Sequence, residues 1–141
     1  MKYLALICCF SLAALPVSSA CGEEALTLGQ LNQPLRLTGA DLQQLMTEAS
    51  MSRTTSNGSI QRWSNDTDGS FVMSNSRLGA KPSTMRGTWH ISDDRYCVII
   101  EKKGGAEDWC RLVIKTTDGY YLAKSDKFPT EKVNEIGIKA K

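Results

Sequence analysis

The fold is decided by residues 85–116, which read MRGTWHISDDRYCVIIEKKGGAEDWCRLVIKT. This stretch holds two of the three tryptophans and two of the cysteines, Cys97 and Cys110. Between the cysteines lie a β-branched run, Val98-Ile99-Ile100, and a glycine pair, Gly104-Gly105. β-branched runs on either side of a glycine-containing turn are typical of a β-hairpin. The stretch therefore predicts two paired strands.

The two cysteines predict a register for this hairpin. If Cys97 faces Cys110, Val98 faces Trp109, the pairing continues to Glu101 opposite Ala106, and residues 102–105 form a four-residue loop. Opposed Cα atoms in an antiparallel pair are about 4.5 or 5.5 Å apart, which a disulfide can span. We expect a Cys97–Cys110 disulfide that adds roughly 3 kcal/mol at most. The alternative is a pair of reduced, buried thiols.

The N-terminus has the pattern of a secretory signal peptide. Residues 1–20, MKYLALICCFSLAALPVSSA, carry Lys2, an apolar run over 3–15 and small residues ending at Ala20. The run is shorter than the about 20 residues that a membrane helix needs. We expect cleavage after Ala20, which would also remove Cys8 and Cys9, and a mature protein that is periplasmic or secreted.

Cleavage after Ala20 would place Cys21 at the mature N-terminus. Bacterial lipoproteins acylate a cysteine at this position, but their pattern has a leucine-like residue where this chain has Ser18. A plain periplasmic or secreted protein with a spare thiol is favoured. The alternative is an outer-membrane lipoprotein, whose anchor at Cys21 would be its one contact with the membrane.

Length and charge limit the classes of partner. Removing residues 1–20 removes one lysine and no acidic residue, which leaves 16 basic against 15 acidic side chains in a mature chain of 121 residues. That length indicates a single domain with one modest core. Because nucleic-acid binders carry a clear basic stripe, this balance argues against a nucleic-acid partner.

The chain after the signal begins with an arm and a short helix. Residues 21–36 contain Leu26, Leu28 and Leu31, which could dock on a barrel mouth, but we expect a partly ordered arm. Residues 39–49 have leucine, methionine and alanine at helical spacing, and Thr38 with Asp41 predicts an N-terminal cap. We expect one amphipathic helix that packs on a sheet as a lid or plug.

Tight turns divide the remaining chain into short strands. Turn signals occur at Asn57-Gly58, residues 66–69, Asp93-Asp94 and Asp118-Gly119. They separate about eight predicted strands, at 52–56, 59–64, 71–73, 88–91, 96–101, 109–116, 120–123 and 133–138. The chain is therefore mainly β, with residues 37–141 forming an antiparallel up-and-down meander closed into a small barrel or folded into a sandwich.

The sequence contains no complete set of catalytic or metal-ligating residues. His90 is the only histidine, and strand alternation places it on the face opposite Trp89. A zinc site needs three or four nitrogen or sulfur ligands, and no G-x-S-x-G motif occurs. Asp66 and Asp68 resemble half of a calcium loop, but turns also favour aspartate. We expect no enzyme activity, metal or cofactor.

The aromatic residues fall on different predicted strands. In a barrel of about eight strands, such side chains either fill the interior or line a cavity for one small ligand. Filling is favoured, and a cavity for a small apolar ligand is the alternative. The residues that would line such a cavity are Trp63, Phe71, Trp89, Tyr96, Trp109 and Tyr120.

Three segments resemble a known family. LTGADLQQLM at 37–46, GTWHISDDRYC at 87–97 and DWCRLV at 108–113 are similar to small secreted bacterial proteins of a domain-of-unknown-function family, sometimes described as lipocalin-like. The resemblance implies a periplasmic β-barrel and no assigned activity.

We therefore expect a non-enzymatic, lipocalin-like barrel that binds a small ligand or serves as an accessory module of the cell envelope. The alternative is a protein-interaction module, such as an inhibitor of an envelope-directed hydrolase. Its partner would be an envelope protein, contacted by residues 102–105 or Asn57-Gly58.

Overall fold

The structure is a computed structural model that describes residues 24–140. The predicted signal peptide and Cys21 lie outside these residues. The described chain forms, in order, η1 (Leu28–Gln30), β1 (Leu35–Arg36), α1 (Gly39–Met46), β2 (Ser50–Thr54), β3 (Ile60–Asn65), β4 (Ser70–Ser76), β5 (Ser83–Ser92), β6 (Arg95–Lys102), β7 (Gly105–Lys115), β8 (Tyr120–Ala123) and β9 (Val133–Lys139).

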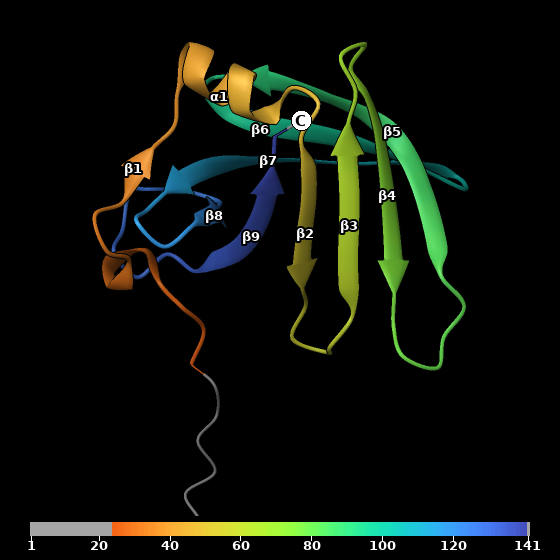
Figure 1. Ribbon diagram of the computed structural model, residues 1–141, viewed down its shortest axis with the longest axis horizontal. Helices are drawn as coiled ribbons and strands as arrows, with labels where there is room; N and C mark the ends of the chain where they lie inside the picture. The colour runs from red at the N-terminus through yellow and green to blue at the C-terminus, as the bar shows by residue number, and fades with distance from the viewer. Residues whose placement is uncertain (1–23, 141) are drawn as a thin grey trace, which may run out of the picture.

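Strands β2 to β9 form a closed antiparallel barrel (Figure 1). Each strand pairs with the next along the chain, and β9 returns to pair with β2, so that Met51 lies opposite Ile138. β1 is an extra strand beside the end of β7, with Arg36 opposite Ile114. The predicted up-and-down barrel is confirmed, and the sandwich alternative is wrong because strand pairing is continuous around the ring.

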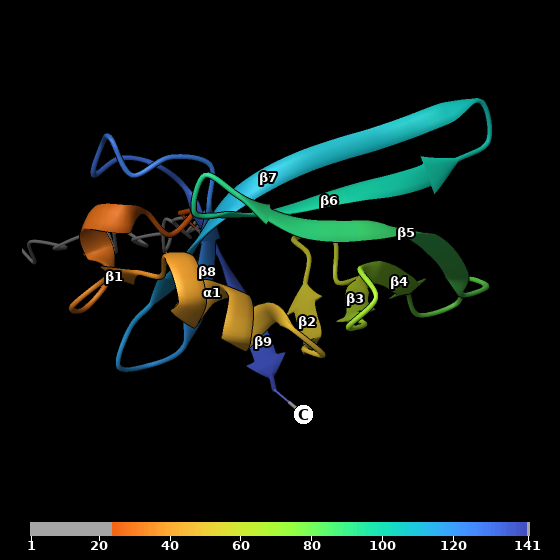
Figure 2. The same cartoon turned by 90° about the horizontal axis from the view of Figure 1, so that it is seen from above.

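The β6–β7 hairpin has the predicted register. Cys97 pairs with Cys110 across the two strands, with their Cα atoms 4.0 Å apart, and the two form a disulfide. The predicted four-residue loop is wrong, because Lys102 also pairs with Gly105 and leaves only two residues in the turn. Gly104, at φ 93°, supplies the left-handed conformation that this shorter turn needs. Figure 2 shows the hairpin diverging from β3 and β4 toward its tip.

Helix α1 covers one end of the barrel, which we call the capped end (Figure 1). Leu42 and Met46 on its inner side are fully buried in the main core, as expected for a lid. The helix ends at Met46 and not at residue 49, because Glu48 takes a left-handed conformation (φ 56°) that turns the chain into β2. No helix in residues 24–140 is long and apolar enough to cross a membrane.

The cap of α1 differs from the prediction. The Thr38 side chain makes no capping hydrogen bond. The backbone N–H of Gly39 donates instead to Oδ1 of Asp94, over 2.7 Å. Asp94 reaches the helix from the predicted β5–β6 turn, where it and Asp93 both have positive φ. A carboxylate at a helix N-terminus accepts a hydrogen bond from a free N–H and interacts favourably with the positive end of the helix dipole.

The N-terminal arm packs on the outer face of the barrel. Leu28 and Leu31 lie against a second apolar cluster. The arm is also fixed by backbone hydrogen bonds from Leu28 N to Glu131 O (2.8 Å) and from Val133 N to Leu26 O (3.0 Å). A partly ordered arm was therefore the wrong expectation for residues 24–36. Covering is needed because β7, β8 and β9 bury apolar residues on both faces. The outer ones are Leu112, Ile114, Ala123 and Val133.

Candidate functional site

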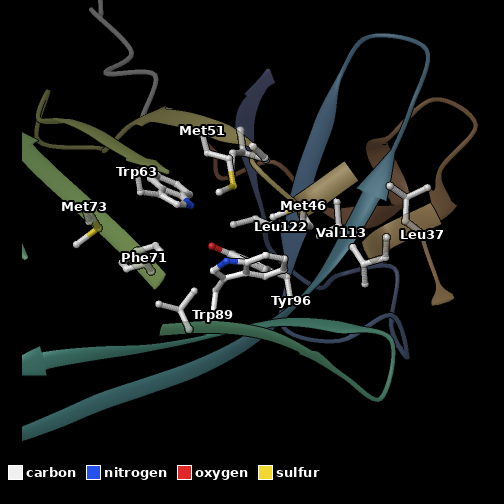
Figure 3. Close-up of a cluster of buried hydrophobic side chains, with 14 of the residues drawn as sticks. Leu37, Met46, Met51, Trp63, Phe71, Met73, Trp89, Tyr96, Val113 and Leu122 are labelled. Carbon is white, nitrogen blue, oxygen red and sulfur yellow. The ribbon is translucent and has the colours of Figure 1, made fainter. Parts of the chain in front are cut away.

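The interior of the capped end is filled by aromatic side chains. Phe71, Trp89 and Tyr96 are almost completely buried and point toward one another (Figure 3). The ring centroids of Trp89 and Tyr96 are 6.3 Å apart at a tilted angle, which is a favourable aromatic contact. These three residues belong to the set predicted to line a cavity, and the structure places them in packed core.

A buried hydrogen-bond chain joins α1 to the barrel at this end. The Tyr96 hydroxyl donates to Oδ1 of Asn65 (2.8 Å), and Nδ2 of Asn65 donates to the Met46 carbonyl at the end of α1 (2.8 Å). Burial raises the pKa of the Tyr96 hydroxyl well above its ordinary value, and the hydrogen bond to Asn65 only partly opposes this shift. The tyrosine therefore stays neutral and has a structural task.

The opposite end of the barrel, which we call the open end, contains a cavity of about 220 Å³. Two of the predicted aromatic residues, Trp63 and Trp109, line it. Trp109 also packs edge-on against Tyr96, with ring centroids 5.7 Å apart, so the cavity rests directly on the aromatic core. Its remaining wall is formed by the apolar residues Met73, Met85, Ile100 and Leu122 and the polar residues Arg53, Gln61, Lys102 and Glu107.

The other candidate residues lie away from this cavity. Tyr120 is half-buried against the main core, and His90 is exposed. Asp66 and Asp68 are occupied by their own turn, since Asp66 accepts from the Ser70 hydroxyl (3.2 Å) and Asp68 from the Ser70 backbone N–H (2.8 Å). Nowhere in residues 24–140 do three or more His, Cys, Asp or Glu side chains gather as a metal site.

Two arginines inside the barrel were missed by the sequence analysis. Arg53 on β2 lies on the same face as buried Met51, and its Cζ is 5.9 Å from the centroid of the Trp63 ring. Arg111 on β7 lies on the same face as Trp109, and its Cζ is 5.5 Å from that ring centroid. Side chains alternate along a strand, so Arg53 lies on the same face as Met51. The sequence alone did not show that Met51 belongs to this strand and points into the barrel.

The charge of these arginines is not balanced by a direct ion pair. The ion pairs found in residues 24–140 are Lys102–Glu107 at the cavity rim and Arg36–Asp126 on the outer surface. Burial lowers the pKa of the Arg53 guanidinium from its ordinary value, and the positive charge of Arg111 lowers it further. The Arg53 guanidinium remains charged, because the ordinary arginine pKa lies far above neutrality.

Comparisons with protein-family models, curated proteins and solved structures find no match to this chain.

Proposed function

We propose that this protein is a non-enzymatic, extracytoplasmic barrel that binds a small ligand in the open-end cavity. The observation that carries the proposal is the cavity itself, which lies between the packed aromatic core and the barrel mouth. Ligand sites in proteins are concave and mostly apolar, with a few placed polar groups, and the mouths of β-barrels are common locations for them.

The wall of the cavity supports binding over catalysis. Its ten lining residues include no serine, threonine, cysteine or histidine, so the usual nucleophiles and their bases are missing from it. The one carboxylate, Glu107, is exposed and paired with Lys102. A general acid or base needs a carboxyl group positioned within hydrogen-bond reach of the substrate. Glu107 instead forms an ion pair with Lys102 at the cavity rim.

Two features support a location outside the cytoplasm. The Cys97–Cys110 disulfide is of a kind that persists in oxidising compartments, and residues 1–20 have the pattern of a secretory signal. We propose a periplasmic or secreted protein, with acylation at Cys21 as the alternative that would anchor it to the outer membrane. The family resemblance of the three sequence segments agrees with this location and stays a prediction.

The test is native mass spectrometry of the protein purified from its natural host, with two variants. Met85→Trp places a larger side chain in the cavity wall, whereas Thr84→Trp makes a similar change on the exposed outer face of the same strand. We expect a bound small molecule on the wild type and on Thr84→Trp, and none on Met85→Trp. A wild type without any bound molecule, or one that Met85→Trp leaves bound, would contradict the proposal.

One observation favours the alternative of a protein-interaction module. The tip of the β6–β7 hairpin, residues 102–105, is exposed and stands away from β3 and β4 (Figure 2). Such a tip has the shape of a loop that enters another protein's groove. If the alternative holds, a protein should co-purify with the wild type and be lost from Lys103→Glu, while Met85→Trp should retain it.

A further inference from the structure

The interior of the barrel contains two arginine–tryptophan pairs. Arg53 lies over Trp63 and Arg111 over Trp109, at 5.9 and 5.5 Å from the ring centroids. Stacking on an aromatic face orients the flat guanidinium group and favours its charge. Both tryptophans line the cavity, as does Arg53. Arg53 thus presents its positive charge to a ligand in the cavity, and Arg111 lies over the ring of Trp109, a wall residue.

The orientation of Arg53 is fixed further by Gln61. Nε of Arg53 donates to Oε1 of Gln61 over 2.6 Å, across the β2–β3 pair in which these residues are directly opposed. This is the hydrogen bond that Arg53 makes among the described residues, and it uses only one of the five guanidinium N–H groups. The edge formed by the two Nη atoms keeps its donors for another acceptor. A planar acceptor with two oxygens matches that edge.

The local charge is positive. Arg53, Arg111 and Lys102 carry three positive charges in and beside the cavity, against one negative charge on Glu107. Glu107 is bound to Lys102, and no carboxylate in residues 24–140 lies within 4.0 Å of either arginine. Partly buried charges without a partner cost free energy that an incoming counter-charge recovers.

Resting on the proposed function, we infer that the ligand of this cavity is a small amphipathic carboxylate. Its carboxylate accepts two hydrogen bonds from the Nη edge of Arg53, and Arg111 strengthens the local positive field. Its apolar part lies against Met73, Met85 and Ile100, next to the Trp63 and Trp109 rings. The two halves of the ligand thus match the two kinds of residue in the cavity wall.

The size of the cavity restricts the ligand to a small one. Drug-sized pockets occupy roughly 300–1,000 Å³, and this cavity holds about 220 Å³. At about 30 Å³ for each water-sized group, it takes roughly seven such groups. A short alkyl chain or a single ring fits, and any longer part would leave through the barrel mouth.

The test titrates protein refolded from urea, which removes any bound molecule, with octanoate and with 1-octanol by isothermal calorimetry. Both probes are unbranched and contain eight carbon atoms, and they differ in the head group, which is a charged carboxylate in one and a neutral hydroxyl in the other. The variants are Arg53→Gln, which removes the arginine charge that lines the cavity, and Arg62→Gln, which makes the same change at an exposed position on β3. Met85→Trp reports on the cavity alone.

We expect octanoate to bind the wild type at least about tenfold more tightly than octanol, because a hydrogen-bonded charge pair in a partly dry site contributes that much. Arg53→Gln should abolish this preference, with Arg62→Gln unchanged. Equal binding of the two probes, with no effect of Arg53→Gln, would overturn the inference. If Met85→Trp then abolished the binding of both octanoate and octanol, the cavity would still be supported as the ligand site. Failure of octanoate to bind at all would also overturn the inference, and the proposed function would then be decided by native mass spectrometry.

Discussion

The two ends of one barrel interior use the same strands for different purposes. At the capped end, Tyr96, Asn65 and the Met46 carbonyl form a closed hydrogen-bond chain inside packed aromatic residues. At the open end, half-buried Arg53 lines a cavity, and half-buried Arg111 stacks on Trp109, which also lines it. The packed, hydrogen-bonded residues that stabilise the barrel are thus concentrated under α1, and the open end can carry positive charge that no carboxylate pairs with.

The change from buried core to cavity wall occurs within single strands. On the inward face of β3, Asn65 and Trp63 belong to the buried core, and Gln61 is half-buried at the cavity. On β2, Met51 is buried and Arg53, two residues later on the same face, lines the cavity. Each strand thus changes from core to site over two residues.

The largest effect is expected from truncating a core side chain at the capped end. Leu42→Ala removes a fully buried side chain from α1, and should lower the free energy of unfolding by about 3 kcal/mol. Met85→Ala, at the cavity wall, should lower it by less than about 1 kcal/mol, because its surroundings are already partly open. Urea unfolding at neutral pH measures both, and equal losses would contradict the division between the two ends.

A smaller effect is expected from the buried hydroxyl of Tyr96. Tyr96→Phe leaves Oδ1 of Asn65 without its donor and should cost about 2 kcal/mol at pH 7. Far-UV circular dichroism during urea unfolding measures this loss. A cost near zero would show that the hydrogen-bond chain does not hold α1 to the barrel.

The same residue predicts a dependence on pH. The pKa of Tyr96 is raised in the folded state above its ordinary value of 10.0. Above about pH 10 this tyrosine ionises in the unfolded chain while it stays neutral in the folded protein. Its contribution to the free energy of unfolding is therefore complete below about pH 10 and is lost as the pH rises further. The wild type should lose about 1.4 kcal/mol for each pH unit above 10 more than Tyr96→Phe does. Parallel pH profiles for the two proteins would contradict this.

The smallest effect on stability, with a possible change of sign, is expected from Arg53→Gln. Removing a partly buried charge that has no carboxylate partner should change the free energy of unfolding by less than about 1 kcal/mol, in either direction. Arg62→Gln, on the exposed face, is the matched control. A large destabilisation by Arg53→Gln alone would mean that Arg53 supports the fold and does not serve a ligand.

The sequence predicted most of what local pattern determines. Asn57-Gly58, Asp93-Asp94 and Asp118-Gly119 mark real turns, and the spacing from Cys97 to Cys110 predicted the hairpin register. These features depend on residues close together in the chain, whose preferences for turn and strand are strong.

Features that depend on distant segments were not predictable in the same way. The capping of Gly39 by Asp94 and the docking of Leu28 on the outer face both need the closed barrel. Gly87, in the GTW motif, is another case: a Cβ there would overlap the carbonyl oxygen of Ile99 on the neighbouring strand. The division of the aromatic residues between core and cavity likewise depends on barrel closure, which a strand pattern does not specify.

The three tryptophans allow one direct test of the difference between the two ends. Trp63 and Trp109 line the cavity, whereas Trp89 lies in the capped end with its Nε1 bonded to the Asp66 carbonyl (2.9 Å). Octanoate titration can be followed by the indole N–H signals in a ¹H–¹⁵N NMR spectrum, each assigned with a Trp→Phe variant. We predict saturable shifts for Trp63 and Trp109 and none for Trp89; equal shifts of all three, or no shift at all, would contradict the account.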